Sequence, residues 1–150
     1  MKLSALVPMV MLVWADVYAA DLQVRIIDAT TARPKQGVHL KVYTNSDPAV
    51  HTKYPRRSFD VQTDQTGTAS FGINSLTELR VTVFIQDGGC SPPLHYDVSA
   101  LLRDGVVGKN QCAHTNERIR DIRASPGEII MFWERGMSFW EALTPPDLWP

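Results

Sequence analysis

The stretch TDQTGTASFGI, residues 63–73, decides the fold class because it reads as a tight turn followed by a strand. Asp64 can accept hydrogen bonds from the amides of the turn, and Gly67 can take a positive φ, so the chain can reverse at low strain. After the turn, apolar residues alternate with small ones, at Ala69, Phe71 and Ile73. This alternation predicts a strand with one buried face, paired through the turn with the residues before it.

Further short strands are predicted on both sides of this hairpin. The clearest is LRVTVFI, residues 79–85, in which four apolar residues alternate along one face. EIIMFW, residues 128–133, is apolar almost throughout, which indicates a strand buried on both faces. The remaining predicted strands cover residues 22–27, 38–43 and 58–62. Short strands with frequent turn residues and little helical periodicity predict an all-β fold, an antiparallel β-sandwich of about seven strands.

Two regions between these strands are harder to interpret. Residues 94–111 contain HYDVSALLRDG, which fits either a short helix capped by Gly105 or a strand followed by a loop. RIRDIR, residues 118–123, has isoleucines three positions apart, which fits neither a regular strand nor a long helix. We expect a bulged strand there.

The first twenty residues are typical of a secretory signal peptide. An apolar run that is too short to cross a bilayer comfortably is followed by Val17 and Ala19, at positions −3 and −1 of a small-residue cleavage site. We therefore expect residues 1–19 to be cleaved, leaving a β-sandwich domain over 20–135 and a tail over 136–150. The expected location is periplasmic or secreted.

The charge balance limits the classes of partner. The whole chain has a net charge of −1, and signal cleavage would remove one residue of each sign, Lys2 and Asp16. A near-neutral balance argues against nucleic acid and against a strongly anionic membrane surface as partners. No later segment is apolar and long enough to span a membrane, and no cysteine follows the cleavage site to carry a lipid, so no stable membrane anchor is expected.

The two cysteines, Cys90 and Cys112, are expected to form a disulfide, which is the usual state in an oxidising compartment. The alternative is a metal site, because His95 follows the first cysteine and His114 follows the second. The spacings CSPPLH and CAH lack the close pairing of structural zinc sites, so we expect no bound metal. No cofactor motif is present, and none is expected.

One frame of residues resembles a known class of module. A first strand ending in Asp, a turn with Pro and Gly, a second strand and then T-D-x-x-G-x-a-x-F resembles the transthyretin-like and carboxypeptidase regulatory-like β-sandwich modules. The frame residues are Asp28, Pro34, Gly37, Thr63, Asp64, Gly67, Ala69 and Phe71. The resemblance covers about residues 22–85 and implies an immunoglobulin/transthyretin-like sandwich; it implies little about function, because such modules serve many systems.

The catalytic members of that class have features that this chain lacks. The hydroxyisourate hydrolases have a histidine in the first strand and end in Tyr-Arg-Gly-Ser, whereas this chain has LQVRII and LWP. Pilin-like relatives can form a Lys–Asn cross-link between the first and last strands, and here those strands contain neither the Lys nor the Asn. No nucleophile elbow, zinc helix or phosphate loop occurs either, so we predict that the protein is not an enzyme.

Two segments are candidates for binding a protein partner. The loop HTKYPRRSF, residues 51–59, presents Tyr54, Arg56 and Arg57, and Tyr and Arg are favoured at interface hot spots. The tail contains a predicted short C-terminal helix, residues 138–143, with a capping pattern at its start. Within the tail, Trp140, Leu148 and Trp149 could either pack on the sandwich or enter a partner's cleft.

These features predict an exported, non-catalytic protein-binding module. Its most concrete form is a periplasmic immunity or inhibitor protein that blocks a toxin or hydrolase. One alternative is a structural or adhesive surface module whose exposed strands assemble with other domains. Another is a small-ligand-binding or hydroxyisourate hydrolase-like protein with a pocket under the tail.

Overall fold

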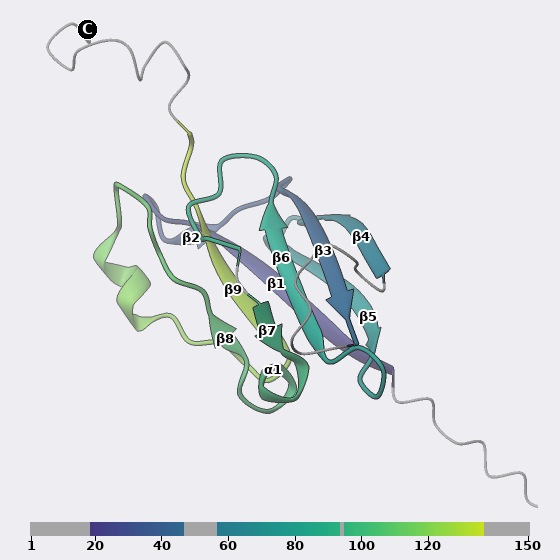
Figure 1. Ribbon diagram of the computed structural model, residues 1–150. Coiled ribbons are helices and arrows are strands. Elements are labelled where there is room, and N and C mark those ends of the chain that lie inside the picture. The colour runs from purple at the N-terminus through teal and green to yellow at the C-terminus, as the bar shows by residue number, and fades with distance from the viewer. Residues whose placement is uncertain (1–18, 47–56, 94, 137–150) are drawn as a thin grey trace, which may run out of the picture.

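The predicted strands assemble into two facing sheets in the computed structural model, which describes residues 19–46, 57–93 and 95–136 (Figure 1). One sheet has the order β2-β1-β9-β8, and β5 also pairs with β1. Its strands are β1 (Ala19–Asp28), β2 (Arg33–Pro34), β5 (Thr68–Asn74), β8 (Val106–Val107) and β9 (Glu128–Trp133). The other sheet has the order β4-β3-β6-β7. Its strands are β3 (His39–Asn45), β4 (Arg57–Gln62), β6 (Arg80–Ile85) and β7 (His95–Asp97).

The all-β sandwich predicted from the sequence is confirmed, with one addition to its strand directions. β9 runs parallel to β1 and to β8, whereas the other strand pairs are antiparallel. A parallel neighbour needs a crossover of a dozen or more residues, and residues 108–127 between β8 and β9 provide that length. β9 thereby lies beside β1 with both faces covered, which explains its continuous apolar sequence.

The core lies between the two sheets and is built by the predicted alternation. In β3 and β6, every second residue is fully buried, as in Leu40, Val42, Val81 and Val83. Facing residues of β1, β5 and β9 complete the layer. Among the residues described, no helix is long and apolar enough to cross a membrane.

A second apolar cluster lies on the outer side of the sheet that contains β1 and β9. The segment between β8 and β9 packs over this side, and its helical turn is the unlabelled light-green coil at the left of Figure 1. The prediction of a bulged strand over 118–123 is wrong, because the chain forms a 3-10 helix there, η1 (Glu117–Asp121). Three residues complete one 3-10 turn, so the spacing of Ile119 and Ile122 puts both side chains against the cluster, which includes Ile130 and Phe132.

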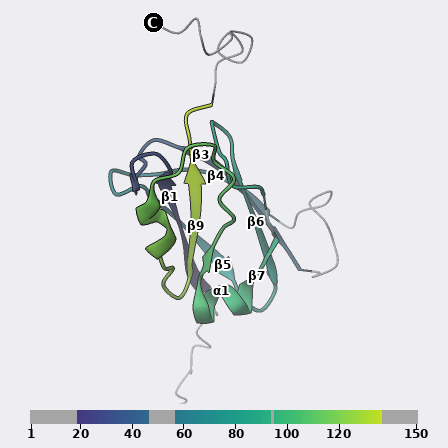
Figure 2. The same ribbon diagram turned by 90° about the vertical axis from the view of Figure 1, so that its left-hand side faces the viewer.

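The ambiguous region 94–111 contains β7, then the helix α1 (Val98–Asp104), then β8. Asp97 begins the helix by accepting a hydrogen bond from the amide of Ala100 at 3.0 Å. Gly105 ends it, as one of the two interpretations predicts, with φ of 65° and its N–H donating to Leu101 O at 2.9 Å. Figures 1 and 2 show α1 beside β7, where it closes one end of the sandwich.

Two turns of the resemblance frame pack against each other near the end of β1. Thr63 Oγ1 donates to Lys35 O at 2.8 Å and accepts from the amide of Val38 at 2.9 Å. Asp64 Oδ1 accepts from both the amide and the hydroxyl of Thr66, at 2.8 and 2.6 Å, as predicted for this turn. The hydrogen bonds of Thr63 join the β2–β3 turn to the β4–β5 turn, and those of Asp64 close the β4–β5 turn itself.

Replacing Gly67 with alanine is expected to lower the free energy of unfolding by about 2 kcal/mol or more. Gly67 has φ of 72°, and an added Cβ would lie 2.7 Å from Pro34 Cβ and 2.8 Å from Lys35 N. Gly37→Ala is the matched control, because Gly37 has φ of 76° but the nearest atom to an added Cβ is 3.9 Å away. Urea unfolding of both variants separates the cost of the steric collision at Gly67 from the cost of placing alanine at a positive φ. Equal losses in the free energy of unfolding for the two variants would contradict the close contact between the turns.

Candidate functional site

The two outer faces of the sandwich differ in what lies on them. The outer side of β1 and β9 carries the second apolar cluster, whereas the outward side chains of β3, β4 and most of β6 are exposed or half-buried. We call this second surface the polar face. It comprises His39, Lys41, Tyr43, Ser58, Asp60, Gln62, Phe84, Gln86 and His95.

Two aromatic rings lie together on the polar face. Tyr43 of β3 and Phe84 of β6 meet edge to face, with ring centroids 5.5 Å apart and an interplanar angle of 89°. Both side chains are half-buried, although they point away from the core. The solvent side of an antiparallel sheet is ordinarily polar, so a packed aromatic pair there makes this surface a candidate for binding.

Charged and polar groups beside the aromatic pair hold each other in place. Lys41 Nζ lies 2.6 Å from Asp60 Oδ2, and Gln86 Nε2 donates to Asp60 Oδ1 at 3.4 Å. The hydrogen bond to Asp60 raises the pKa of Lys41, and the bond from Lys41 lowers the pKa of Asp60, so both groups are charged at neutral pH. A surface already ordered in this way loses less side-chain entropy when it binds.

An open hollow of about 420 Å³ adjoins Phe84 at the end of β6. The ladder between β6 and β7 ends at Thr82 and His95, and prolines lie in the chain just before this ladder. Proline has no amide hydrogen to continue a ladder, so the chain leaves the sheet edge here and encloses the hollow. The lining residues are Phe84, Ile85, Gly89, Cys90, Ser91, Pro92, Pro93 and Gln111.

Arg57 is the predicted partner-binding residue whose position the structure describes, and it lies at the start of β4. Its Nε and Nη2 donate to the two carboxylate oxygens of Glu78 at 2.6 and 2.8 Å, and Nη2 also donates to Gly72 O at 2.9 Å. The side chain is still 46% exposed, and its guanidinium lies 4.7 Å from the ring of Phe59. Partner binding by Arg57 stays a prediction, and the same side chain also has a structural role as the counter-ion of Glu78.

Glu78 is fully buried beneath Arg57, and the sequence analysis did not single it out. Its oxygens also accept from Thr44 Oγ1 at 2.6 Å and from the amide of Asn74 at 2.7 Å. Burial alone would raise the pKa of Glu78, but the hydrogen bonds from Arg57, Thr44 and the Asn74 amide outweigh burial and lower it. The arrangement fixes the start of β4, where the predicted binding loop enters the sheet.

The other predicted partner-binding residues lie outside the described part of the chain, as does the short C-terminal helix. They are Tyr54, Arg56, Trp140, Leu148 and Trp149. Trp133, at the end of β9, donates from Nε1 to Asp87 O at 2.6 Å, with Lys35 Nζ 4.0 Å from its ring. These contacts account for Trp133 by local packing.

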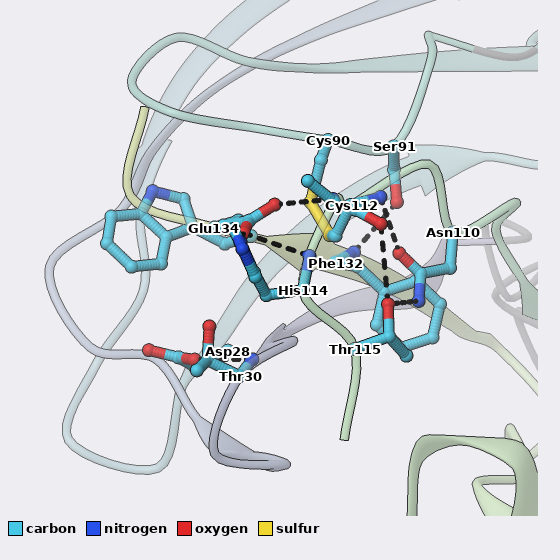
Figure 3. The surroundings of a disulfide bond; sticks show 12 residues. Asp28, Thr30, Cys90, Ser91, Asn110, Cys112, His114, Thr115, Phe132 and Glu134 are labelled. Atoms are coloured by element: carbon cyan, nitrogen blue, oxygen red, sulfur yellow. Dashed lines mark hydrogen bonds and ion pairs between the residues drawn. A yellow bond between two sulfur atoms is a disulfide. The ribbon is translucent and has the colours of Figure 1, made fainter. Parts of the chain in front are cut away.

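The predicted disulfide between Cys90 and Cys112 is confirmed, and Figure 3 shows its surroundings. It joins the loop after β6 to the segment after β8, beside the second apolar cluster. Ser91, next to Cys90, accepts from the amide of Phe132 at 2.8 Å. Of the two histidines in the metal alternative, His114 lies here, whereas His95 bonds to Thr82 Oγ1 at 2.7 Å on the polar face.

Sequence reasoning missed Tyr43 and Phe84 as a site, although a signal was present. Tyr43 is the last residue of VHLKVY and lies on the side opposite the buried residues. In LRVTVFI, Phe84 occupies one of the alternate positions that point away from the core. An aromatic at a solvent-phase position of a strand marks a surface residue worth explaining. Their proximity needed the β3–β6 register, in which Lys41 lies opposite Phe84 and Tyr43 opposite Thr82.

No protein-family model matches this chain, and no curated protein matches it either. Among solved structures, it is similar to the full-length major pilin SpaD from Corynebacterium diphtheriae, with 16% sequence identity and a TM-score of 0.42. The alignment covers 76% of this chain and 29% of the pilin chain, so this chain spans less than a third of the pilin's length. A likeness at this level carries no conclusion about function, and the sandwich rests on the observed strand pairing.

Proposed function

We propose that this chain is an exported, non-catalytic module that binds another protein through the polar face. The observation that carries the proposal is the Tyr43–Phe84 pair, two aromatic rings packed together on the solvent side of a sheet. Aromatic residues concentrate binding energy at protein interfaces, particularly beside a pocket from which water can be expelled. The open hollow next to Phe84 has room for a side chain of the partner.

The surroundings of the aromatic pair support a protein partner. The polar residues around the rings carry both signs of charge, in Lys41 and Asp60, and form a rim around an apolar centre. A near-neutral surface of this kind matches a folded protein better than it matches a polyanion. The predicted binding loop that contains Tyr54 and Arg56 leads into β4 at Arg57, whose own side chain lies on the inner side of the strand and pairs with Glu78.

We assign the module to the transthyretin-like and carboxypeptidase regulatory-like class as part of the same proposal. The contacts of its frame residues support this assignment: Thr63 joins the two turns, and Gly67 lies where a side chain would collide with Pro34. The most concrete function is a periplasmic immunity or inhibitor protein that blocks a toxin or hydrolase. The predicted signal peptide and the observed disulfide support that location.

The double variant Tyr43→Ala/Phe84→Ala is expected to lose about 30-fold or more in affinity for the partner, because two anchor side chains are removed. The measurement is capture from an extract of the producing cells by immobilised full-length protein, followed by titration of the captured protein. Leu76→Ala is the matched control, since Leu76 is a 64% exposed apolar residue outside the polar face. Equal capture by both variants would contradict the proposal.

A structural or adhesive module is the second candidate, and the position of β4 favours it. β4 is the edge strand of its sheet and pairs with β3 alone among the strands described. An edge strand can add a strand from another chain. Light scattering at micromolar concentration distinguishes the two: concentration-dependent self-association supports assembly through strands, whereas a monomer that binds one partner supports the first proposal.

A further inference from the structure

Three side chains with metal-binding atoms meet at the disulfide, from three separate segments, and His114 contacts one of them (Figure 3). Cys90 follows β6, Cys112 and His114 follow β8, and Glu134 follows β9. The two sulfurs and a carboxylate oxygen of Glu134 lie within 4.8 Å of one another. His114 Nδ1 lies 2.6 Å from Glu134 Oε1, so the imidazole belongs to the same group.

These atoms match the ligands that zinc prefers. Zinc binds thiolate, imidazole and carboxylate groups in a tetrahedron, with bonds of about 2.0 to 2.3 Å. Such bonds place neighbouring ligand atoms about 3.3 to 3.8 Å apart. The sulfurs must therefore separate on reduction, and the imidazole of His114 must turn toward them from its contact with Glu134. In the oxidised protein the sulfurs are bonded to each other and cannot serve as thiolates.

We propose that reduction of the Cys90–Cys112 disulfide converts this cluster into a site for one Zn²⁺. A dithiol reductant gives two electrons and two protons, becomes a disulfide itself, and leaves two thiols in place of the S–S bond. A phosphine gives the two electrons and becomes a phosphine oxide, while one water molecule supplies its oxygen and the two thiol protons. Zinc binding then releases both thiol protons, and the thiolates, His114 and one oxygen of Glu134 hold the metal. The disulfide and the metal exclude each other, because both use the same sulfur atoms.

The remainder of the site is in place before the metal arrives. The carboxylate of Glu134 accepts from the amides of Ala113 and His114, at 2.7 and 3.1 Å, which holds it toward the disulfide. Both cysteines lie outside strands and helices, where the chain can adjust as the sulfurs separate.

The test uses the full chain and Co²⁺, a spectroscopic substitute for zinc, with and without a phosphine reductant. The reduced protein is expected to bind one Co²⁺ per chain, with tetrahedral bands and a thiolate charge-transfer band. The oxidised protein is expected to show neither. Zn²⁺ should displace the Co²⁺ and remove the bands. Equal metal binding by the oxidised and reduced proteins would overturn the proposal.

Two histidine variants make the test specific to this cluster. His114→Ala is expected to weaken Co²⁺ binding about tenfold or more and to change the tetrahedral bands. His95→Ala is the matched control, because His95 also follows a cysteine in the sequence but bonds to Thr82 on the polar face. Equal affinities for the two variants would show that the thiols bind metal without this site, and the proposal would fail.

A fold control removes one remaining ambiguity. Reduced protein unfolded in urea still has both thiols, but its four ligands are no longer held together. It should bind Co²⁺ more weakly than the reduced protein in buffer, whose fold is checked by circular dichroism. If the unfolded chain binds metal as tightly as the folded chain, the cluster adds nothing and the inference is wrong.

Discussion

Replacing Arg57 with alanine is expected to lower the free energy of unfolding at pH 7 by about 3 to 5 kcal/mol, because it leaves a buried carboxylate without its counter-ion. Glu78 is 1% exposed and receives two hydrogen bonds from Arg57. The remaining donors, Thr44 Oγ1 and the Asn74 amide, do not neutralise the charge. Denaturant unfolding of both proteins at several pH values is the measurement.

The loss should shrink as the pH falls. In the native protein the pKa of Glu78 is lowered from 4.5. The ionised group therefore contributes its full share to the free energy of unfolding above pH 4.5, and this contribution is lost as the pH falls through the lowered pKa. Without Arg57, no cation opposes the effect of burial on Glu78. Burial then raises the pKa of Glu78 relative to its value in the native protein. At low pH the carboxyl group is neutral in both proteins, and the difference between them narrows.

Arg103→Ala is the control for this result. Arg103 also forms an ion pair, with Asp104 at 2.8 Å, but both side chains are more than half exposed. Such surface pairs contribute little, so the variant should unfold nearly as the native protein does. A pH-independent loss in Arg57→Ala, or a loss no larger than that of Arg103→Ala, would contradict the role assigned to Glu78.

Replacing both Cys90 and Cys112 with serine is expected to lower the free energy of unfolding by roughly 3 kcal/mol, because the unfolded chain regains the freedom of the closed loop. The cysteines are 22 positions apart. For a domain of this size, the loss corresponds to a fall in melting temperature of about 10 °C. Thermal unfolding followed by circular dichroism measures it.

A phosphine reductant provides the matching control. Reductant should lower the melting temperature of the native protein toward that of the double variant and leave the double variant unchanged. Zinc-free buffer with a chelator is needed, since metal bound by the reduced protein would restore part of the stability. A native melting temperature that does not respond to reductant would contradict a stabilising disulfide.

The sandwich could be predicted from the sequence because one-sided burial leaves a visible period of two. The segments 68–73 and 79–85 show this period and correspond closely to β5 and β6, and the continuous apolar run 128–133 corresponds to β9. Patterns of this kind depend on neighbouring residues alone. The period of three in RIRDIR was the exception, because a single 3-10 turn and an irregular strand produce similar short patterns.

The candidate sites could be predicted only in part, because they depend on contacts between distant segments. The disulfide could be predicted from the expected compartment and from the count of two cysteines. The burial of Glu78 could not be predicted, since its partner Arg57 is 21 positions away and an acidic residue between two strands is ordinarily in a turn. Glu134 meets His114 only because β9 passes beside the segment after β8.

Photo-cross-linking from the polar face tests the central proposal most directly. A photoreactive residue is placed at Phe84 in one variant and at Leu76 in another, and each full-length protein is irradiated in extract from the producing cells. The account predicts one specific protein adduct from position 84, absent from position 76 and suppressed by an excess of unlabelled native protein. No competed adduct from position 84, or the same adduct from both positions, would contradict binding through the polar face.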